Sequence, residues 1–346
     1  MTEDLQRYSK QVLFHGIGEA GQRELMRRRV FICGCGALGT VLAEGMVRAG
    51  VGFVRIVDRD FVELSNLQRQ VLFDESDIAE QLPKAIAAAR KLSRINSTIE
   101  IEPIVADVSY ENVLGFADGV DLILDGTDNF ETRYLLNDVS LETGIPWIYG
   151  GCIGSHGQTM AIFPGETACL RCLIDAVPEP GSVETCDTAG VLAAIINVIA
   201  SLQVVDALKI LSGQPNLIEP KLTVIDVWDG TFRRMNMEGL RDRSGCPACH
   251  AGERVWLRGT QGSQTTILCG RNAVQVSPPS KTRLSFDDLA NRLAGFGTIS
   301  YNKYLLRITL NDGNYELTAF QDGRVIIKGT EDIPTAKTLY AKYIGN

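Results

Sequence analysis

Residues 30–39 read VFICGCGALG, a β-branched and aromatic run that leads into the pattern Gly-x-Gly-x-x-Gly. The pattern is typical of a strand, a tight turn and a helix: Gly34 permits the turn, Gly36 lets backbone N–H groups approach a phosphate, and Gly39 allows the helix to pack on the sheet. Asp58 ends the next β-branched run, 58 − 39 = 19 residues later, where a carboxylate binds ribose hydroxyls. The stretch therefore predicts a nucleotide-binding βαβ unit; the alternative is a tight turn without a ligand.

The same alternation of short apolar runs and helical patterns continues outward from this stretch to about residue 149. Alternating strands and helices are typical of an α/β fold with a doubly wound, mostly parallel, Rossmann-like sheet. We expect helices at 38–49, 84–95, 132–143 and 191–211, and strands at 30–33, 53–57, 99–101, 120–124, 147–149 and 222–228. Residues 175–190 are rich in Pro, Gly and Ser and predict a long surface loop.

The pattern changes after Cys249, where hairpin turns and short strands replace the alternating order. Residues 255–346 are expected to form a small C-terminal α+β module with helices at 286–294 and 333–343 and strands at 266–269, 304–310, 315–320 and 325–328. Residues 1–254 are then the nucleotide-binding domain.

Composition excludes several classes of protein. The 346 residues carry 34 basic and 42 acidic side chains, a net charge of 34 − 42 = −8, without a basic cluster that would bind nucleic acid. The first residues show no basic segment followed by an apolar stretch, so we expect a cytoplasmic protein. Residues 191–211 are apolar but interrupted by polar side chains, which favours a buried helix over a membrane span.

Charged side chains recur where predicted strands end. Arg69 lies in the segment SNLQRQ, Lys84 opens a predicted helix, and Asp128 lies in the segment TDN. Two cations and one carboxylate suit a triphosphate with Mg²⁺ better than a nicotinamide ring. An NAD-dependent oxidoreductase is the alternative, but the chain has three histidines and shows no candidate proton relay. Taken singly, each charge also fits a solvated surface.

The nine cysteines divide by spacing. Cys169 and Cys172, and 73 residues later Cys246 and Cys249, form two Cys-x-x-Cys pairs that can close one tetrahedral structural Zn²⁺ site. Redox pairs or two disulfides are the alternatives. Cys186 precedes a predicted helix, and a helix N-terminus favours the thiolate, so it is a candidate nucleophile or a dispensable loop residue. The remaining four are interpreted as packing residues: Cys33, Cys35, Cys152 and Cys269.

Together these motifs resemble the ThiF/MoeB/HesA family, bacterial relatives of ubiquitin-activating enzymes, over about residues 5–250. They occur in one order: Arg7-Tyr8-Ser9-Lys10-Gln11, residues 34–39, Asp58, residues 65–70, Pro83-Lys84, residues 127–129, the two cysteine pairs and residues 186–190. The resemblance implies Mg-ATP-dependent adenylation of the C-terminal Gly-Gly of a small ubiquitin-like sulfur-carrier protein, a homodimer, and a structural zinc. It implies a sulfur donor protein as a further partner.

The resemblance also assigns roles to individual residues. It implies nucleotide contacts at Gly34, Gly36, Ala37, Gly39, Asp58, Ser65, Asn66, Arg69, Lys84, Asp128 and Asn129, with magnesium at Asp128. It places Cys186 at a loop cysteine proposed to form a covalent link with the carrier, and Lys10 where relatives carry an arginine that reaches the neighbouring subunit's ATP. Lysine keeps the charge but not the bidentate fork.

The C-terminal residues indicate which sulfur carrier the chain activates. Residues 267–275 and 322–324 resemble the extension of thiazole-biosynthesis ThiF enzymes, which favours a thiazole sulfur carrier over the molybdopterin carrier. A carboxylate is already nucleophilic toward the α-phosphorus, so positioning and charge neutralisation suffice and no general base is needed.

Overall fold

The structure is a computed structural model that describes residues 3–175, 189–261, 265–268, 272–277, 283–311 and 313–344. The described chain forms two compact units, and the first ends at Gln261. The predicted boundary after residue 254 lies earlier than this, because Asp138 accepts hydrogen bonds from the backbone N–H groups of Trp256 and Leu257 and so holds this segment on the first unit.

The first unit contains an eight-stranded sheet in the order β3-β2-β1-β4-β5-β6-β7-β8. Strands β1 to β5 pair in parallel, whereas β6, β7 and β8 are antiparallel. The predicted α/β fold with a mostly parallel sheet is thereby confirmed. The strands are β1 Arg29–Cys33, β2 Phe53–Asp58, β3 Glu100–Val105, β4 Leu122–Asp125, β5 Trp147–Ile153, β6 His156–Ile162, β7 Lys221–Asp226 and β8 Thr231–Asn236.

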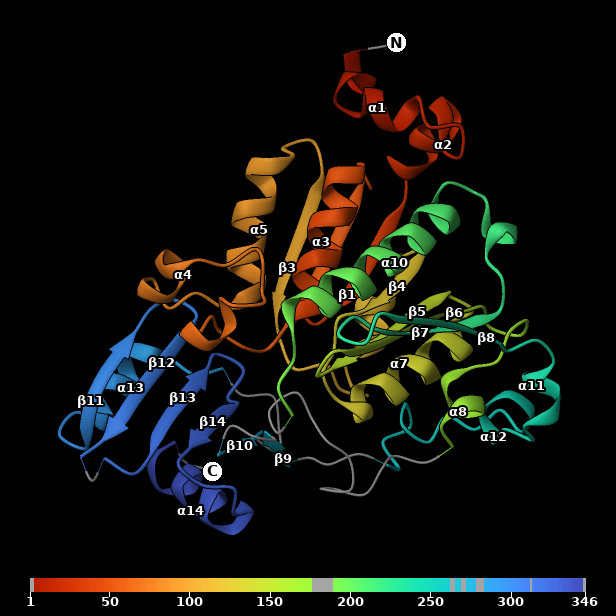
Figure 1. The fold of residues 1–346 in the computed structure, drawn as a ribbon. Coiled ribbons are helices and arrows are strands. Elements are labelled where there is room, and N and C mark those ends of the chain that lie inside the picture. Colours follow the sequence, from red (N-terminus) through yellow and green to blue (C-terminus); the bar gives the residue numbers. More distant parts are fainter. Residues whose placement is uncertain are drawn as a thin grey trace. The chain divides into compact units, whose positions relative to one another are not determined.

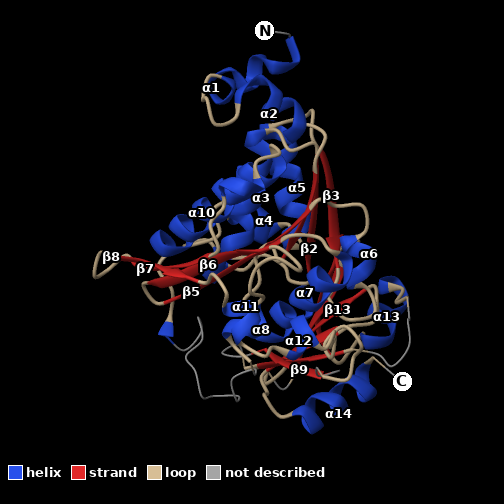
Figure 2. Cartoon of the chain, turned by 90° about the vertical axis from the view of Figure 1, so that its right-hand side faces the viewer, coloured by secondary structure: helices blue, strands red, loops and turns tan. Residues whose placement is uncertain are grey.

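Helices cover both faces of this sheet (Figures 1 and 2). Helices α3, α5 and α10 pack on one face and α7 on the other. The helices are η1 Glu3–Tyr8, α1 Ser9–Val12, α2 Gly18–Leu25, α3 Ala37–Ala49, η2 Leu64–Asn66, α4 Glu75–Ala79, α5 Lys84–Ile95, α6 Val113–Ala117, α7 Phe130–Thr143, α8 Leu170–Leu173, α10 Ala193–Leu211, η3 Pro215–Leu217, α11 Leu240–Arg243 and α12 Pro247–His250.

The strand order reverses between β1 and β4. The chain runs from β1 outward to β2 and β3, and then returns to β4 on the other side of β1. Ligands of doubly wound sheets bind at this switch point, outside the carboxyl ends of the strands. The buried core beneath it, between the sheet and α7, includes Phe31, Ile123, Leu136 and Trp147.

Helix α10 is, by length and composition alone, apolar enough to span a membrane. It packs with one side against α3, β5 and β6, where Ile195 and Ile199 are fully buried. Its other side leaves apolar side chains exposed, among them Val198 and Val205.

The second unit is a six-stranded antiparallel sheet in the order β11-β12-β13-β14-β10-β9. Helices α13 and α14 contribute Leu289 and Tyr340 to its core. The elements are β9 Thr265–Leu268, β10 Ala273–Val276, α13 Phe286–Leu293, β11 Gly297–Tyr301, β12 Leu305–Leu310, β13 Glu316–Phe320, β14 Val325–Lys328 and α14 Ile333–Tyr343.

Candidate active site

The glycine loop joins β1 to α3, and its shape requires glycine. Gly34 has φ +89°, and a Cβ there would lie 2.6 Å from the carbonyl oxygen of Gly126, in the turn after β4. A Cβ on Gly39 would collide with the carbonyl oxygen of Gly34. Gly36 is the N-cap of α3, so the free N–H groups of the first helical turn, which begins at Ala37, lie at the end of β1.

Asp58 ends β2 and holds the glycine loop. One carboxylate oxygen accepts a hydrogen bond from the Cys35 N–H at 2.6 Å, and the other accepts one from the Asp60 N–H at 2.7 Å. Burial raises the pKa of the Asp58 carboxyl above its ordinary value, and the charge of nearby Lys84 opposes this shift. The oxygens keep further lone pairs for ribose hydroxyls, the role predicted from the sequence.

Lys84 begins α5 and is tied to the end of β2. Its Nζ lies 3.0 Å from a carboxylate oxygen of Asp60, and its backbone N–H donates to the Asp60 carbonyl at 2.9 Å. The Lys84 side chain is only 3% exposed, and the Asp60 carboxylate balances its charge. Asp60 is not among the site residues predicted from the sequence, where the signal for it is a second carboxylate two residues after Asp58.

Helix η2 and the residues that follow it carry the other predicted nucleotide contacts. The Asn66 side-chain oxygen accepts a hydrogen bond from the Glu63 N–H at 3.0 Å and so caps η2, while Arg69 Nη1 donates to the carbonyl of exposed Ser65 at 2.8 Å. Gln70 is buried beside the glycine loop, because a Cβ on Gly36 would lie 3.9 Å from its Nε2. Gln70 is the last residue of the motif SNLQRQ, from which no role is predicted for it.

Asp128 follows β4 and is exposed. The close packing of Gly126 on Gly34 brings this turn against the glycine loop. Asn129 is the N-cap of α7, and its side-chain oxygen accepts a hydrogen bond from the Thr132 N–H at 2.8 Å. The structure therefore places Asp58, Lys84 and Asp128 at the same edge of the sheet, as strand order demands.

Lys10 lies elsewhere. Gln11, its neighbour, donates to the carbonyl of Ala49 at 2.9 Å, at the end of α3 that is opposite to the glycine loop. Thirteen helical residues span about 20 Å, so exposed Lys10, on α1, is remote from the glycine loop of the same chain; Figure 1 shows α1 beyond one end of α3.

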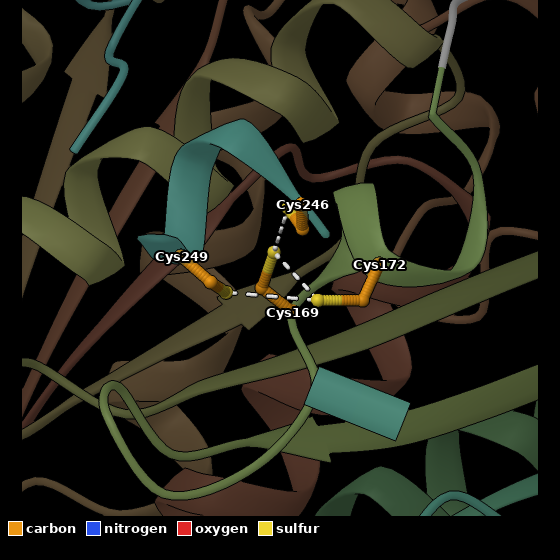
Figure 3. A group of neighbouring side chains, drawn as sticks. All are labelled: Cys169, Cys172, Cys246 and Cys249. Carbon is orange, nitrogen blue, oxygen red and sulfur yellow. Dashed lines mark hydrogen bonds between the residues drawn. The ribbon is translucent and has the colours of Figure 1, made fainter. Parts of the chain in front are cut away.

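Four cysteines come together from two one-turn helices (Figure 3). Their Sγ atoms all lie within 4.8 Å of one another, with separations of 3.8 Å for Cys169–Cys172 and for Cys169–Cys246, and 3.6 Å for Cys172–Cys249. Four sulfurs on a tetrahedron with Zn–S bonds of 2.3 Å are about 3.8 Å apart. These distances fit a zinc site and exceed a disulfide bond.

The thiols of this cluster shift one another's pKa values in opposite directions. Their mutual hydrogen bonds hold the pKa of the Cys172 thiol well below its ordinary value and that of the Cys169 thiol well above it. Zinc binds the thiolate form, so a bound ion would take the place of these hydrogen bonds. Cys186 and Cys269 lie outside the described residues, so the covalent role of Cys186 stays a prediction.

Residues 8–248 match the model of the ThiF family. The chain belongs to the ThiF family. It is 42% identical to the sulfur carrier protein ThiS adenylyltransferase of Bacillus subtilis (strain 168), over 98% of this chain and 99% of that protein. It is 36% identical to the sulfur carrier protein adenylyltransferase of Thermus thermophilus, over 71% of this chain and 91% of that protein.

A solved structure has the same fold. That of Escherichia coli MccB with ATP matches 67% of this chain and 71% of its own, with a TM-score of 0.58 and 25% identity. The ThiF family assignment and this likeness agree with a nucleotide site built at the glycine loop.

Proposed function

We propose that this chain transfers AMP from ATP to the C-terminal Gly-Gly carboxylate of a small ubiquitin-like sulfur carrier of the ThiS type, for thiazole and thiamine biosynthesis. The main support is that Asp58 and Lys84, held at the end of β2, and Asp128, in the turn after β4, lie at one edge of the sheet around the glycine loop. The ThiS carrier is favoured because the B. subtilis relative is similar across both units of this chain.

Each group has a defined task in this reaction. The first-turn N–H groups of α3 bind phosphate, Asp58 binds the ribose, and Arg69 and Lys84 oppose the charge of the phosphates. Asp128 offers the carboxylate oxygen that Mg²⁺ prefers, and an ion held there would neutralise charge on the leaving pyrophosphate. A carrier carboxylate oxygen bonds to the α-phosphorus while the bond to pyrophosphate breaks. The product is a carrier acyl-adenylate.

Mass spectrometry tests the product directly. Incubation with Mg-ATP and a ThiS-like carrier is expected to add one AMP to the carrier, and added pyrophosphate is expected to remove it. A carrier that keeps its mass under these conditions contradicts the proposal.

We infer that two chains assemble and that Lys10 serves the partner's site. The support is twofold: α10 leaves Val198 and Val205 exposed, and Leu13 and Phe14 project from the segment after Lys10, 75% and 55% exposed. A second copy would cover such apolar surface.

A mixture of two inactive variants tests this arrangement. Lys10→Ala and Asp128→Ala are each expected to abolish most adenylation. In a symmetric dimer, half of the randomly mixed pairs carry one intact site of two, so an equal mixture is expected to regain about a quarter of the wild-type rate. No recovery in the mixture, with the exchange of chains verified by mass, would show that Lys10 does not act in the partner's site.

The exposed edge strand β8 is proposed as part of the carrier's docking surface. Phe232 and Met235 are exposed on it, and Arg233 and Arg234 occupy its centre. Antiparallel pairing of two copies of β8 would set Arg233 against Arg234, and like charges opposite each other are unfavourable. An acidic strand of another protein fits this edge better.

Charge reversal tests the edge. The double variant Arg233→Glu, Arg234→Glu is expected to raise the KM for the carrier about tenfold or more and to leave the KM for ATP unchanged. The matched control reverses exposed Arg94 and Arg258, outside this edge. Equal losses in both double variants would refute docking at β8.

We infer that the four-cysteine cluster holds a structural Zn²⁺, because its sulfur separations and donor set fit that ion. Zinc would join α8 and α12, which are far apart in sequence.

Free thiols persist in a reducing compartment, which supports the cytoplasm as the location of the chain.

A further inference from the structure

The turn between β4 and α7 is held from several directions. Thr127, which precedes Asp128, donates two hydrogen bonds to one carboxylate oxygen of Asp125, from its N–H at 2.9 Å and from its hydroxyl at 2.7 Å. Its carbonyl accepts a hydrogen bond from Arg133 Nη2 at 2.8 Å. The backbone that leads into Asp128 is therefore fixed by two side chains.

Asp125 and Arg133 form a buried ion pair that links this turn to β5. Asp125 is fully buried and Arg133 is 8% exposed, and the pair is 3.3 Å apart. The second carboxylate oxygen of Asp125 accepts from the Gly150 N–H at 3.4 Å, and Arg133 Nη2 donates to the Gly150 carbonyl at 3.2 Å. Burial raises the pKa of Asp125, and Arg133 opposes that shift.

A third buried side chain, from α10, contacts the backbone of Asp125. Gln203 is fully buried, and its Nε2 donates to the carbonyls of Asp125 at 3.2 Å and Ile148 at 3.3 Å. Gly150 admits this side chain, because a Cβ there would lie 2.6 Å from Gln203. The end of β4 is thus fixed to Ile148 and Gly150 of β5, next to the turn that carries Asp128.

A buried ion pair is a costly way to stabilise a fold, since apolar side chains of similar volume serve as well. What this pair adds is a fixed backbone geometry. We propose that Asp125 and Arg133 are positioning residues that hold Asp128 where it binds the metal ion of Mg-ATP; this rests on the proposed function. The guanidinium is required because its fork reaches a carboxylate and two carbonyls at once, which a lysine cannot do.

The test compares Arg133→Lys with Asp138→Asn. Asp138 is fully buried, as Asp125 is, and lies on α7, as Arg133 does. Its carboxylate accepts hydrogen bonds from the N–H groups of Trp256 and Leu257 and none from the turn before Asp128. Binding of Mn²⁺ in the presence of ATP is followed by electron paramagnetic resonance, with the melting temperature measured alongside. Groups that orient a metal ligand typically change metal affinity 10- to 100-fold. Arg133→Lys is expected to raise the Kd for Mn²⁺ by about tenfold or more.

Asp138→Asn is expected to lower the melting temperature without changing the Kd for Mn²⁺. Thr127→Val removes one hydrogen bond to Asp125 and serves if Arg133→Lys does not fold; it should weaken Mn²⁺ binding in the same direction. Unchanged Mn²⁺ affinity in these variants, or an equal loss in Asp138→Asn, would overturn the proposal. Because Mn²⁺ binding needs no carrier, a wild-type chain that fails to adenylate a carrier would count against the proposed function alone.

Discussion

Asp128→Ala is expected to lower carrier-dependent ATP–pyrophosphate exchange by roughly 1,000-fold. Asp128 is the exposed carboxylate in the turn after β4, against the glycine loop. Its removal takes away the proposed ligand of Mg²⁺, so the charge of the departing pyrophosphate would be poorly neutralised. Binding of ATP should weaken less than the rate falls, because Lys84, Arg69 and the glycine loop remain.

Asp118→Ala is the matched control for this prediction. Asp118 is another exposed carboxylate, but it precedes β4 and so lies at the opposite edge of the sheet. Its removal changes the net charge equally and should leave exchange at the wild-type rate. If Asp128→Ala retained full exchange, the site would not use this carboxylate.

The second large effect is expected at the cysteine cluster. The wild-type chain should contain one equivalent of zinc, and Cys249→Ser should lose most of it, because one of four thiolates is gone. Without zinc, α12 is no longer linked to α8. The loss of the metal should lower the unfolding free energy by on the order of 3 kcal/mol, or the melting temperature by about 10 °C. Metal analysis and thermal unfolding measure both effects.

Cys152→Ser is the control for this variant. Cys152 lies on β5 outside the cluster, so its replacement should leave the zinc content unchanged. A wild-type chain purified without zinc, whose stability does not respond to added zinc or to a chelator, would contradict a structural metal.

The sequence predicted the parallel half of the large sheet well, because each of its strands is a β-branched run next to a helical pattern. It did not predict β6 or β8. In β6, Gly157 replaces an apolar residue where α10 packs closely, since a Cβ there would collide with Ile199, and glycine weakens the strand pattern. Strand β8 is exposed along its whole length and so lacks an apolar alternation.

Some residues of the candidate site could also be predicted from the sequence, and others could not. Glycine spacing and residues at strand ends revealed Gly34, Asp58 and Asp128, because these signals are local. The partners that hold them are visible only in three dimensions. Arg133 is an ordinary charged residue of a helix in the sequence, and Gln203 an interruption in an apolar run, yet both are buried against the end of β4.

ATP–pyrophosphate exchange with two forms of one carrier tests directly whether this chain adenylates a C-terminal Gly-Gly. One form is a ThiS-like protein that ends in Gly-Gly, and the other lacks the last glycine. We predict rapid exchange with the complete carrier and none above background with the shortened one. No exchange with any carrier that ends in Gly-Gly, or equal exchange with both forms, would contradict the proposed adenylation of the Gly-Gly carboxylate.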